Sequence, residues 1–251
     1  MELSEINNQV KNCRKCRLHE TRKHSLPGEG NDNARLFLIA QAPGKVENDK
    51  GKMFVGPSGK IFHQLTSCAG VSWNDFYVSN LIKCQLPKSR KPKQDEIDIC
   101  SKYLDKEIEI ITPEIFVPLG YYATIYIFRK YHLPEFSKKN FPNHIGRLRR
   151  INGRKIFPLS HPATLLYDPH REEKLKSDYN KLKILKKECK WYSACPIKYF
   201  TEKGLLDKKW VDMYCRGDWE NCVRYKMEES GEYHSDYMLP DGVCFSFQTD
   251  S

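Results

Sequence analysis

The sequence predicts an α/β protein with a three-layer α/β/α arrangement, in which helices cover both faces of a central four-stranded parallel sheet. Short apolar runs rich in β-branched and aromatic residues alternate along the chain with longer stretches of helical periodicity. Strands that alternate with helices form parallel sheets with both faces covered. The chain has 251 residues, 39% of them hydrophobic, which is enough to fill such a core.

Four strands are predicted, and each is an apolar run of five or six residues. In chain order they are RLFLIA (35–40), DFYVSN (75–80), EIFVPL (114–119) and KIFPL (155–159). Runs of this length and composition are typical of strands buried on both faces.

Helices are predicted in three further stretches. Between the second and third strands, apolar residues recur at helical spacing at Ile97, Leu104, Ile108 and Ile111. A second helix follows the turn at Gly120, and its apolar positions are Tyr121, Ile125 and Phe128. A third, polar helix is predicted from His170 to about Lys187.

Charge and composition divide the chain near residue 186. Residues 1–186 contain 33 Lys and Arg against 20 Asp and Glu, whereas residues 187–251 contain 9 against 12 and three of the four Trp. We therefore expect a basic domain over residues 1–186 and a small, mainly helical, Cys- and Trp-rich module over residues 187–251. The basic domain favours a nucleic-acid partner, although many proteins simply carry Lys-rich surfaces. The acidic module suits contact with another protein better than contact with DNA.

The chain contains no apolar run of the ~18 residues that a membrane helix needs. Its first residues resemble no secretory signal. We therefore expect a cytoplasmic protein with no membrane partner. The high Lys, Ile and Asn usage is compatible with an AT-rich prokaryote, so the prokaryotic cytosol is the expected compartment.

Ten cysteines in a cytoplasmic chain favour metal binding over disulfides, because cytosolic thiols stay reduced. Cys13 and Cys16 form a C-x2-C pair. With Cys84 and Cys100 they supply four thiolates for a zinc ion or an iron–sulfur cluster. The fifteen residues between Cys84 and Cys100 exceed common zinc spacings, which favours a cluster. The alternative is that Cys100 is a core residue on the apolar face of its helix.

The C-terminal module contains a second set of four cysteines: Cys189, Cys195, Cys215 and Cys222. These residues could bind a second metal, as zinc or as a cluster. They could equally be small hydrophobic residues in a Trp-rich core, and their spacing leaves both interpretations open.

Polar segments follow three of the predicted strands. They are QAPG (41–44), Asn80 and SHPA (160–163). In open α/β sheets, ligands bind beyond the carboxyl ends of the strands. We therefore expect these three segments to meet in one pocket.

Five motifs follow one another along the first 186 residues. They are Cys13-x2-Cys16-x-Leu18, IAQAPGKVE (39–47), GKMFVGPSGKIF (51–62), VSNLIKCQLPKSRKP (78–92) with Cys100, and SHPATLL (160–166). In sequence and spacing they resemble family 4 uracil-DNA glycosylases, the iron–sulfur branch of that superfamily. The resemblance covers roughly residues 3–186. It implies a uracil-DNA glycosylase-like fold, base-excision repair of uracil in single- or double-stranded DNA, and a [4Fe-4S] cluster on Cys13, Cys16, Cys84 and Cys100.

The resemblance also implies roles for the pocket residues. Phe54 stacks on the flipped base, with a place in the core as the alternative. Asn80 reads N3–H and O4 of uracil, a pattern that cytosine reverses. His161 donates a hydrogen bond to O2 of the leaving base, helped by backbone N–H groups of the turn that contains Ala42 and Gly44.

The group that activates water is less defined, because Ala42 stands where the related family 1 enzymes have an Asp. Gln41 occupies a position where family 4 commonly has Glu. Glu47 could orient the water or exclude the methyl group of thymine, or it could be a surface acid in a polar loop.

Contacts with the rest of the DNA are expected from two further groups. Leu165 and Leu166 are candidates for the wedge that fills the vacated base stack, with core packing as the alternative. Basic side chains that could contact phosphates are Lys88, Arg90, Lys91, Lys93 and those of residues 147–150.

The leading prediction is a monofunctional DNA N-glycosylase, because the turns that form the pocket contain no Lys for Schiff-base chemistry. Two other functions stay open. One is an iron–sulfur protein that holds uracil or abasic DNA without turnover, and the other is a zinc-dependent RNA-binding protein.

Overall fold

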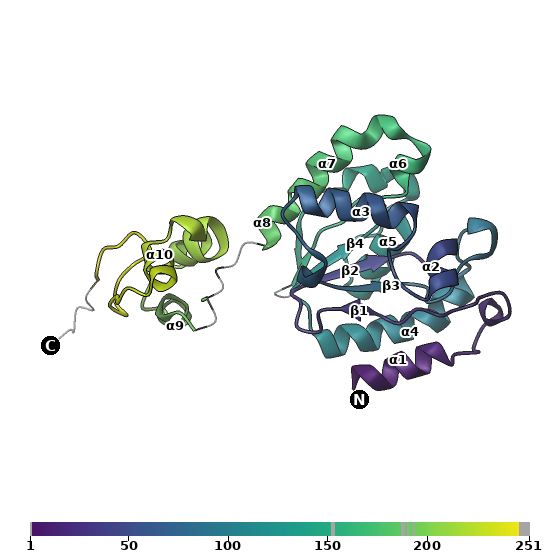
Figure 1. Ribbon diagram of the computed structural model, residues 1–251, viewed down its shortest axis with the longest axis horizontal. Coiled ribbons are helices and arrows are strands. Elements are labelled where there is room, and N and C mark those ends of the chain that lie inside the picture. Colours follow the sequence, from purple (N-terminus) through teal and green to yellow (C-terminus); the bar gives the residue numbers. More distant parts are fainter. Residues whose placement is uncertain (1, 152–153, 187–188, 190, 193, 246–251) are drawn as a thin grey trace. The chain divides into compact units, whose positions relative to one another are not determined.

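The computed structural model describes residues 2–151, 154–186, 189, 191–192 and 194–245. It divides into two compact units, Met1–Leu182 and Lys183–Ser251, each of which has its own core (Figure 1). The sequence places this division at residue 186. No helix in the part of the chain that the model describes is long and apolar enough to cross a membrane.

The first unit is built on a six-stranded sheet with the order β1-β3-β2-β4-β6-β5. The strands are β1 (Glu29–Gly30), β2 (Leu36–Ala40), β3 (Phe76–Asn80), β4 (Ile115–Pro118), β5 (Arg149–Ile151) and β6 (Arg154–Ile156). The four central strands β3, β2, β4 and β6 are parallel, which confirms the predicted four-stranded parallel sheet. The edge strands β1 and β5 pair antiparallel and were not predicted.

The two edge strands are too short for a periodic pattern to reveal. β1 has two residues and β5 has three. A signal for the β5–β6 hairpin was present, because an Asn-Gly dipeptide at residues 152–153 separates the two strands and Asn-Gly favours tight hairpins. The predicted strand at 155–159 is shorter than expected. β6 ends at Ile156, two residues before Pro158, which has no backbone N–H to donate.

Helices cover both faces of the sheet (Figure 1). The α-helices that lie within this unit are α1 (Leu3–Lys11), α2 (Lys45–Lys50), α3 (Pro57–Cys68), α4 (Gln94–Ile111), α5 (Tyr121–Lys130), α6 (Thr164–Tyr167) and α7 (Glu172–Asn180). A further helix, α8 (Leu182–Lys186), begins at Leu182, the last residue of the unit. Short 3-10 segments are η1 (Arg17–Glu20), η2 (Trp73–Asp75), η3 (Pro87–Ser89), η4 (Lys138–Asn143) and η5 (Pro169–Arg171). The helix predicted over 170–187 is therefore broken at Lys181, and Lys187 lies outside the described residues.

Alternating residues of the strands send side chains to opposite faces of the sheet, and both faces are buried. On one face, Phe37, Tyr77 and Phe116 pack against apolar residues of α4 and α5. On the other face, Phe76 of β3 lies 5.9 Å from Phe62 of α3, between ring centroids. α3 in turn packs against α7. This packing gives the three predicted layers.

The second unit is mainly helical. It contains α9 (Pro196–Glu202), the π-helical segment η6 (Val211–Asp218), η7 (Trp219–Asn221) and α10 (Val223–Ser230). Its core includes two of the module's cysteines, Cys189 and Cys215, packed with Ile197 and Val211.

Candidate active site and thiol cavity

The carboxyl ends of the parallel strands bring the predicted pocket segments together. Ala40 at the end of β2 pairs in register with Asn80 at the end of β3. Leu159 bridges to Leu119, which places Ser160 and His161 beside the Gly120 turn. One cavity at this edge is lined by Ala40, Ala42, Pro43, Gly44, Glu47, Met53, Phe54, Ser58, Asn80 and His161. Its volume of about 30 Å³ is room for a water molecule or two. That volume is smaller than a pyrimidine base, so binding of a base requires the cavity to widen.

His161 is held as a neutral imidazole with a defined tautomer. Its Nδ1 accepts a hydrogen bond from the backbone N–H of Ala163 at 3.2 Å. Burial lowers the pKa of His161 to about 4, because a charged ring is poorly solvated there. The proton of the neutral ring is thus on Nε2, which leaves Nε2–H as its hydrogen-bond donor.

Asn80 is 3% exposed, so its amide is shielded from water. Its Nδ2 lies 3.8 Å from the sulfur of Met53, which is a weak acceptor. The Asn80 Oδ1 has no partner among the described residues. The amide is therefore available to a ligand that offers one donor and one acceptor.

Glu47 is buried, at 7% exposure, and not the surface acid that the sequence allowed as an alternative. Its Oε1 accepts a hydrogen bond of 2.7 Å from the backbone N–H of Gly56, just before α3. A Cβ added at Gly44 would lie 2.5 Å from its Oε2, so Gly44 has no room for a side chain. The carboxylate joins the turn after β2 to the start of α3, because α2 directs residue 47 inward.

Phe54 lines the same cavity and is held in an uncommon backbone conformation. Its φ is 52°, in the left-handed region that bulky residues rarely adopt. Its ring lies 4.5 Å from that of Phe62, between centroids. A Cβ at Gly59 would come within 1.9 Å of the Phe54 carbonyl oxygen, so only glycine permits α3 to pass this close. The ring is therefore fixed between the sheet edge and α3.

Three predicted site residues lie outside this cavity. Gln41 is not among its lining residues, and its backbone carbonyl accepts a hydrogen bond from Ile82 N–H at 2.9 Å. Leu165 lines a separate hollow with Leu65 of α3, and Leu166 is 48% exposed. The next residue, Tyr167, is 83% exposed and was not singled out from the sequence.

The first four predicted cysteine ligands share a second cavity. Cys13, Cys16, Cys84 and Cys100 line it together with Arg22, Lys83 and Tyr103, among others. The Arg22 guanidinium donates to the Cys84 sulfur at 3.0 Å, and Lys83 N–H donates to the Cys100 sulfur at 3.1 Å. Burial raises the pKa of the Cys100 thiol to about 12. A bound metal reverses that preference by replacing the proton.

The geometry of this cavity fits a cluster with four thiolate ligands, because Cys13, Cys16, Cys84 and Cys100 all line one space. A zinc ion needs four ligands at about 2.0–2.3 Å from one point, whereas an iron–sulfur cluster holds its thiolates around a larger body. Four thiols around one cavity, with N–H donors directed at two of the sulfurs, fit the cluster.

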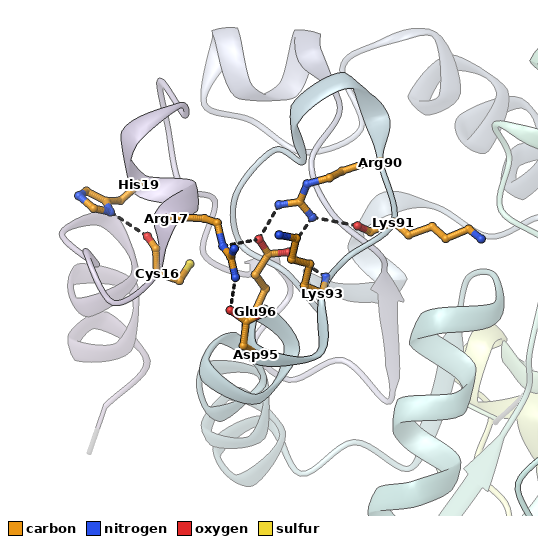
Figure 2. Close-up of polar contacts among 8 residues, drawn as sticks. All are labelled: Cys16, Arg17, His19, Arg90, Lys91, Lys93, Asp95 and Glu96. Atoms are coloured by element: carbon orange, nitrogen blue, oxygen red, sulfur yellow. Dashed lines mark hydrogen bonds and ion pairs between the residues drawn. The ribbon is translucent and has the colours of Figure 1, made fainter.

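An ion-pair network ties the Cys16 segment to the loop of residues 87–93 (Figure 2). The buried Glu96 carboxylate accepts two hydrogen bonds from Arg90, at 2.8 and 2.5 Å, and one from Lys93 N–H at 2.9 Å. Arg17, next to Cys16, contacts Glu96 and pairs with Asp95. The Arg90 guanidinium is thus engaged by Glu96, and a phosphate contact by Arg90, which stays a prediction, would have to replace these bonds.

Sequence reasoning missed a buried ion pair between the two cavities. Lys83 and Glu107 are 1% and 0% exposed, and Lys83 Nζ lies 2.6 Å from Glu107 Oε2. Ser79, next to Asn80, donates to the same oxygen at 2.5 Å. The available signal was Glu107 itself, an acidic residue that follows Leu104 by three positions and so lies on the buried face of α4.

Comparison with known proteins agrees with this geometry. The family model described as the uracil DNA glycosylase superfamily matches residues 27–184. The match covers the whole sheet and every residue that lines the first cavity. This chain belongs to the uracil-DNA glycosylase superfamily.

Its curated relatives place it in one branch of that superfamily, the type-4 uracil-DNA glycosylases. The chain is 40% identical over 187 residues to the type-4 uracil-DNA glycosylase of Saccharolobus solfataricus, covering 71% of this chain and 83% of the relative. It is 35% identical to that of Sulfurisphaera tokodaii, covering 83% of this chain and 93% of the relative. It is 33% identical to the type-4 uracil-DNA glycosylase of Archaeoglobus fulgidus, covering 72% of this chain and 91% of the relative.

Proposed function

We propose that this chain is a uracil-DNA glycosylase of base-excision repair, which hydrolyses the N-glycosidic bond of a flipped deoxyuridine. The single observation that carries the proposal is that Asn80 and the neutral His161 line one cavity with the turn of residues 42–44. Membership of the type-4 branch supports the same reaction. DNA and a reducing environment for thiol ligands are both found in the cytosol, where we place this reaction.

The base is recognised by Asn80. Its Oδ1 accepts from uracil N3–H and its Nδ2 donates to O4, once Nδ2 leaves the weak contact with Met53. Cytosine presents an acceptor at N3 and donors at N4, so both contacts fail. Buried polar groups left unpaired in this way permit discrimination of about 10⁴ or more. Phe54 stacks on the ring and is held by Phe62 behind it.

His161 stabilises the leaving group. As the bond between N1 and C1′ stretches, negative charge gathers on N1 and O2 of uracil. The Nε2–H of the neutral ring donates to O2, and backbone N–H groups at Ala42 and Gly44 add further donors. The low pKa of His161 keeps the ring uncharged at neutral pH, so its Nε2–H acts as a hydrogen-bond donor rather than as a cation.

Glu47 is the carboxylate among the described residues that line this cavity. Water attacks C1′, the C1′–N1 bonding electrons leave with uracil, and the water proton passes to a carboxylate oxygen. Oε1 is occupied by Gly56 N–H, which leaves Oε2 as the acceptor. Gln41 lies outside the cavity. The mechanism therefore does not need a carboxylate at position 41, where family 4 commonly has Glu. The reaction needs no Schiff base and yields an abasic sugar.

The DNA strand is held by the loop of residues 87–93. Lys88, Lys91 and Lys93 are exposed there, while Arg90 fixes the loop to Glu96. The cysteines Cys13, Cys16, Cys84 and Cys100 hold a [4Fe-4S] cluster, which supplies a covalent tether and no step of the reaction. Cys84 and Cys100 flank the loop, so the tether keeps both of its ends in place.

The test is uracil release from an oligonucleotide that contains one uracil, followed by alkaline cleavage at the abasic site. Single-stranded, U:G and U:A substrates should all be cleaved, and the matching cytosine and thymine strands should not. Tight binding of the uracil strand without cleavage would overturn the proposed function in favour of a non-catalytic binding protein.

A further inference from the structure

The second unit contains a cavity that the uracil chemistry does not use. Its volume is about 310 Å³, and its lining includes four thiols together with Trp219 and Arg224. The four cysteines are Cys189, Cys195, Cys215 and Cys222. Segments far apart in the module thus direct all four sulfurs to one space.

The backbone holds the cysteines close to one another. Cys189 N–H donates to the Cys215 carbonyl at 2.7 Å. Cys189 and Cys215 belong to one buried cluster, and Cys195 packs against it. Cys189, Cys215 and Cys222 are buried, whereas Cys68 and Cys244, outside this cavity, are exposed.

Buried donors in the cavity wall have no partner within the described chain. They are Trp219 Nε1 and Arg224 Nε. Arg224 is 3% exposed, and its Nη1 donates to the backbone carbonyls of Ser235 and Met238 at 2.7 and 2.9 Å. An unpaired donor on a buried cation is costly unless an anion lies nearby. Glu228 and Asp236 line the same cavity, and Glu228 is paired with His234 at 2.9 Å. A thiolate-bound metal centre would add negative charge beside the Arg224 guanidinium.

The spacing of the sulfurs distinguishes a cluster from a zinc ion. Five residues separate Cys189 from Cys195 and six separate Cys215 from Cys222, both wider than the usual two to four of structural zinc sites.

We propose that Cys189, Cys195, Cys215 and Cys222 hold a second [4Fe-4S] cluster, separate from the cluster of the glycosylase unit. A unit as short as Lys183–Ser251 builds only a small hydrophobic core and needs a cross-link to fold stably. The cluster provides this cross-link, since it joins the chain before α9, η6 and the start of α10. This proposal does not rest on the proposed function, because its site lies wholly within the second unit.

The test counts iron and acid-labile sulfide in the full-length chain, purified without oxygen and reconstituted with both. The wild type should contain about eight of each per chain, from two clusters of four. The double variant Cys215→Ser/Cys222→Ser should contain about four, and so should Cys84→Ser/Cys100→Ser. The matched control Cys68→Ser/Cys244→Ser changes two exposed cysteines outside both cavities and should keep all eight.

A wild type with four irons per chain overturns the proposal. So does one zinc ion that is lost only in the Cys215→Ser/Cys222→Ser variant. Spectra of the reduced wild-type protein give a second readout that does not depend on how a variant folds. Two distinct cluster signals support the proposal, and one signal contradicts it. None of these outcomes involves uracil release, so failure here is distinguishable from failure of the proposed function.

Discussion

Lys83 connects the two cavities of the first unit. Its backbone N–H donates to the sulfur of Cys100, while its Nζ binds Glu107, which also accepts from Ser79 beside Asn80. The residue that contacts the thiol cavity through its backbone thus supports the base cavity through its side chain. Neither group is exposed to water, so each depends on the other for its charge.

Removing one member of this pair should be strongly destabilising. We expect Glu107→Ala to lower the free energy of unfolding by about 3–5 kcal/mol, because it leaves the Lys83 ammonium buried without a partner. Urea denaturation measures the change. The control is Arg129→Ala, which breaks the exposed pair with Glu135 and should cost less than about 1 kcal/mol. Equal losses in the two variants would contradict the role of the buried pair.

Replacing His161 should remove a donor to the uracil anion. We expect His161→Ala to lower kcat by about 10²- to 10³-fold, with little change in the binding of uracil-containing DNA. Single-turnover cleavage of the uracil oligonucleotide measures it. His170→Ala changes an exposed histidine of η5 and is the matched control. Activity within a few-fold of the wild type would remove His161 from the mechanism.

The lowered pKa of His161 predicts a dependence of stability on pH. The folded pKa is about 4 and the unfolded value about 6.5, so the unfolded chain takes up the proton first as pH falls. The contribution of this group to stability is complete above about pH 6.5 and is lost as pH falls towards 4. Urea midpoints at pH 7 and pH 4.5 should therefore differ more for the wild type than for His161→Ala. The ring should add no inflection to the activity profile between pH 5 and 8.

Two substitutions at Glu47 separate its chemical role from its structural one. Glu47→Gln keeps an oxygen for Gly56 N–H but removes the proton acceptor, so we expect near-normal stability and at least a 10²-fold loss of kcat. Glu47→Ala should lose both, because the Gly56 N–H is left buried and unpaired. If Glu47→Gln cleaves at the wild-type rate, Glu47 only joins the turn to α3 and water is activated elsewhere.

Arg90 and Lys91 are neighbours with different expected roles. Lys91→Ala should weaken DNA binding and reduce the slope of log K against log salt by about 1, as expected for one lost phosphate contact. Arg90→Ala should leave that slope nearly unchanged and lower the melting temperature, because it strips Glu96 of two hydrogen bonds. Binding titrations at several salt concentrations, with thermal melts, test both. A larger salt effect for Arg90→Ala would mean that it leaves Glu96 for the DNA.

Patterns local in sequence predicted the sheet, and pairings across the chain were harder to foresee. The buried strands at 35–40 and 75–80 have continuous apolar runs, so their place in the core could be predicted. The burial of Glu47 could not, because it depends on Gly44 and Gly56 leaving room for a carboxylate. The pairing of Arg90 with Glu96 could not be predicted either, because nothing in the segment around Arg90 shows that Glu96 faces it. Leu165 and Leu166 lie on a four-residue helix that no periodicity distinguishes.

The Arg90–Glu96–Arg17 network holds the loop of residues 87–93 in place by ion pairs as well as by the proposed cluster. If oxidation destroyed the proposed cluster on Cys13, Cys16, Cys84 and Cys100, these ion pairs would still hold one end of the loop near residue 17. The oxidised enzyme would then keep part of its DNA affinity, and that part would fall as salt rises because ion pairs are screened.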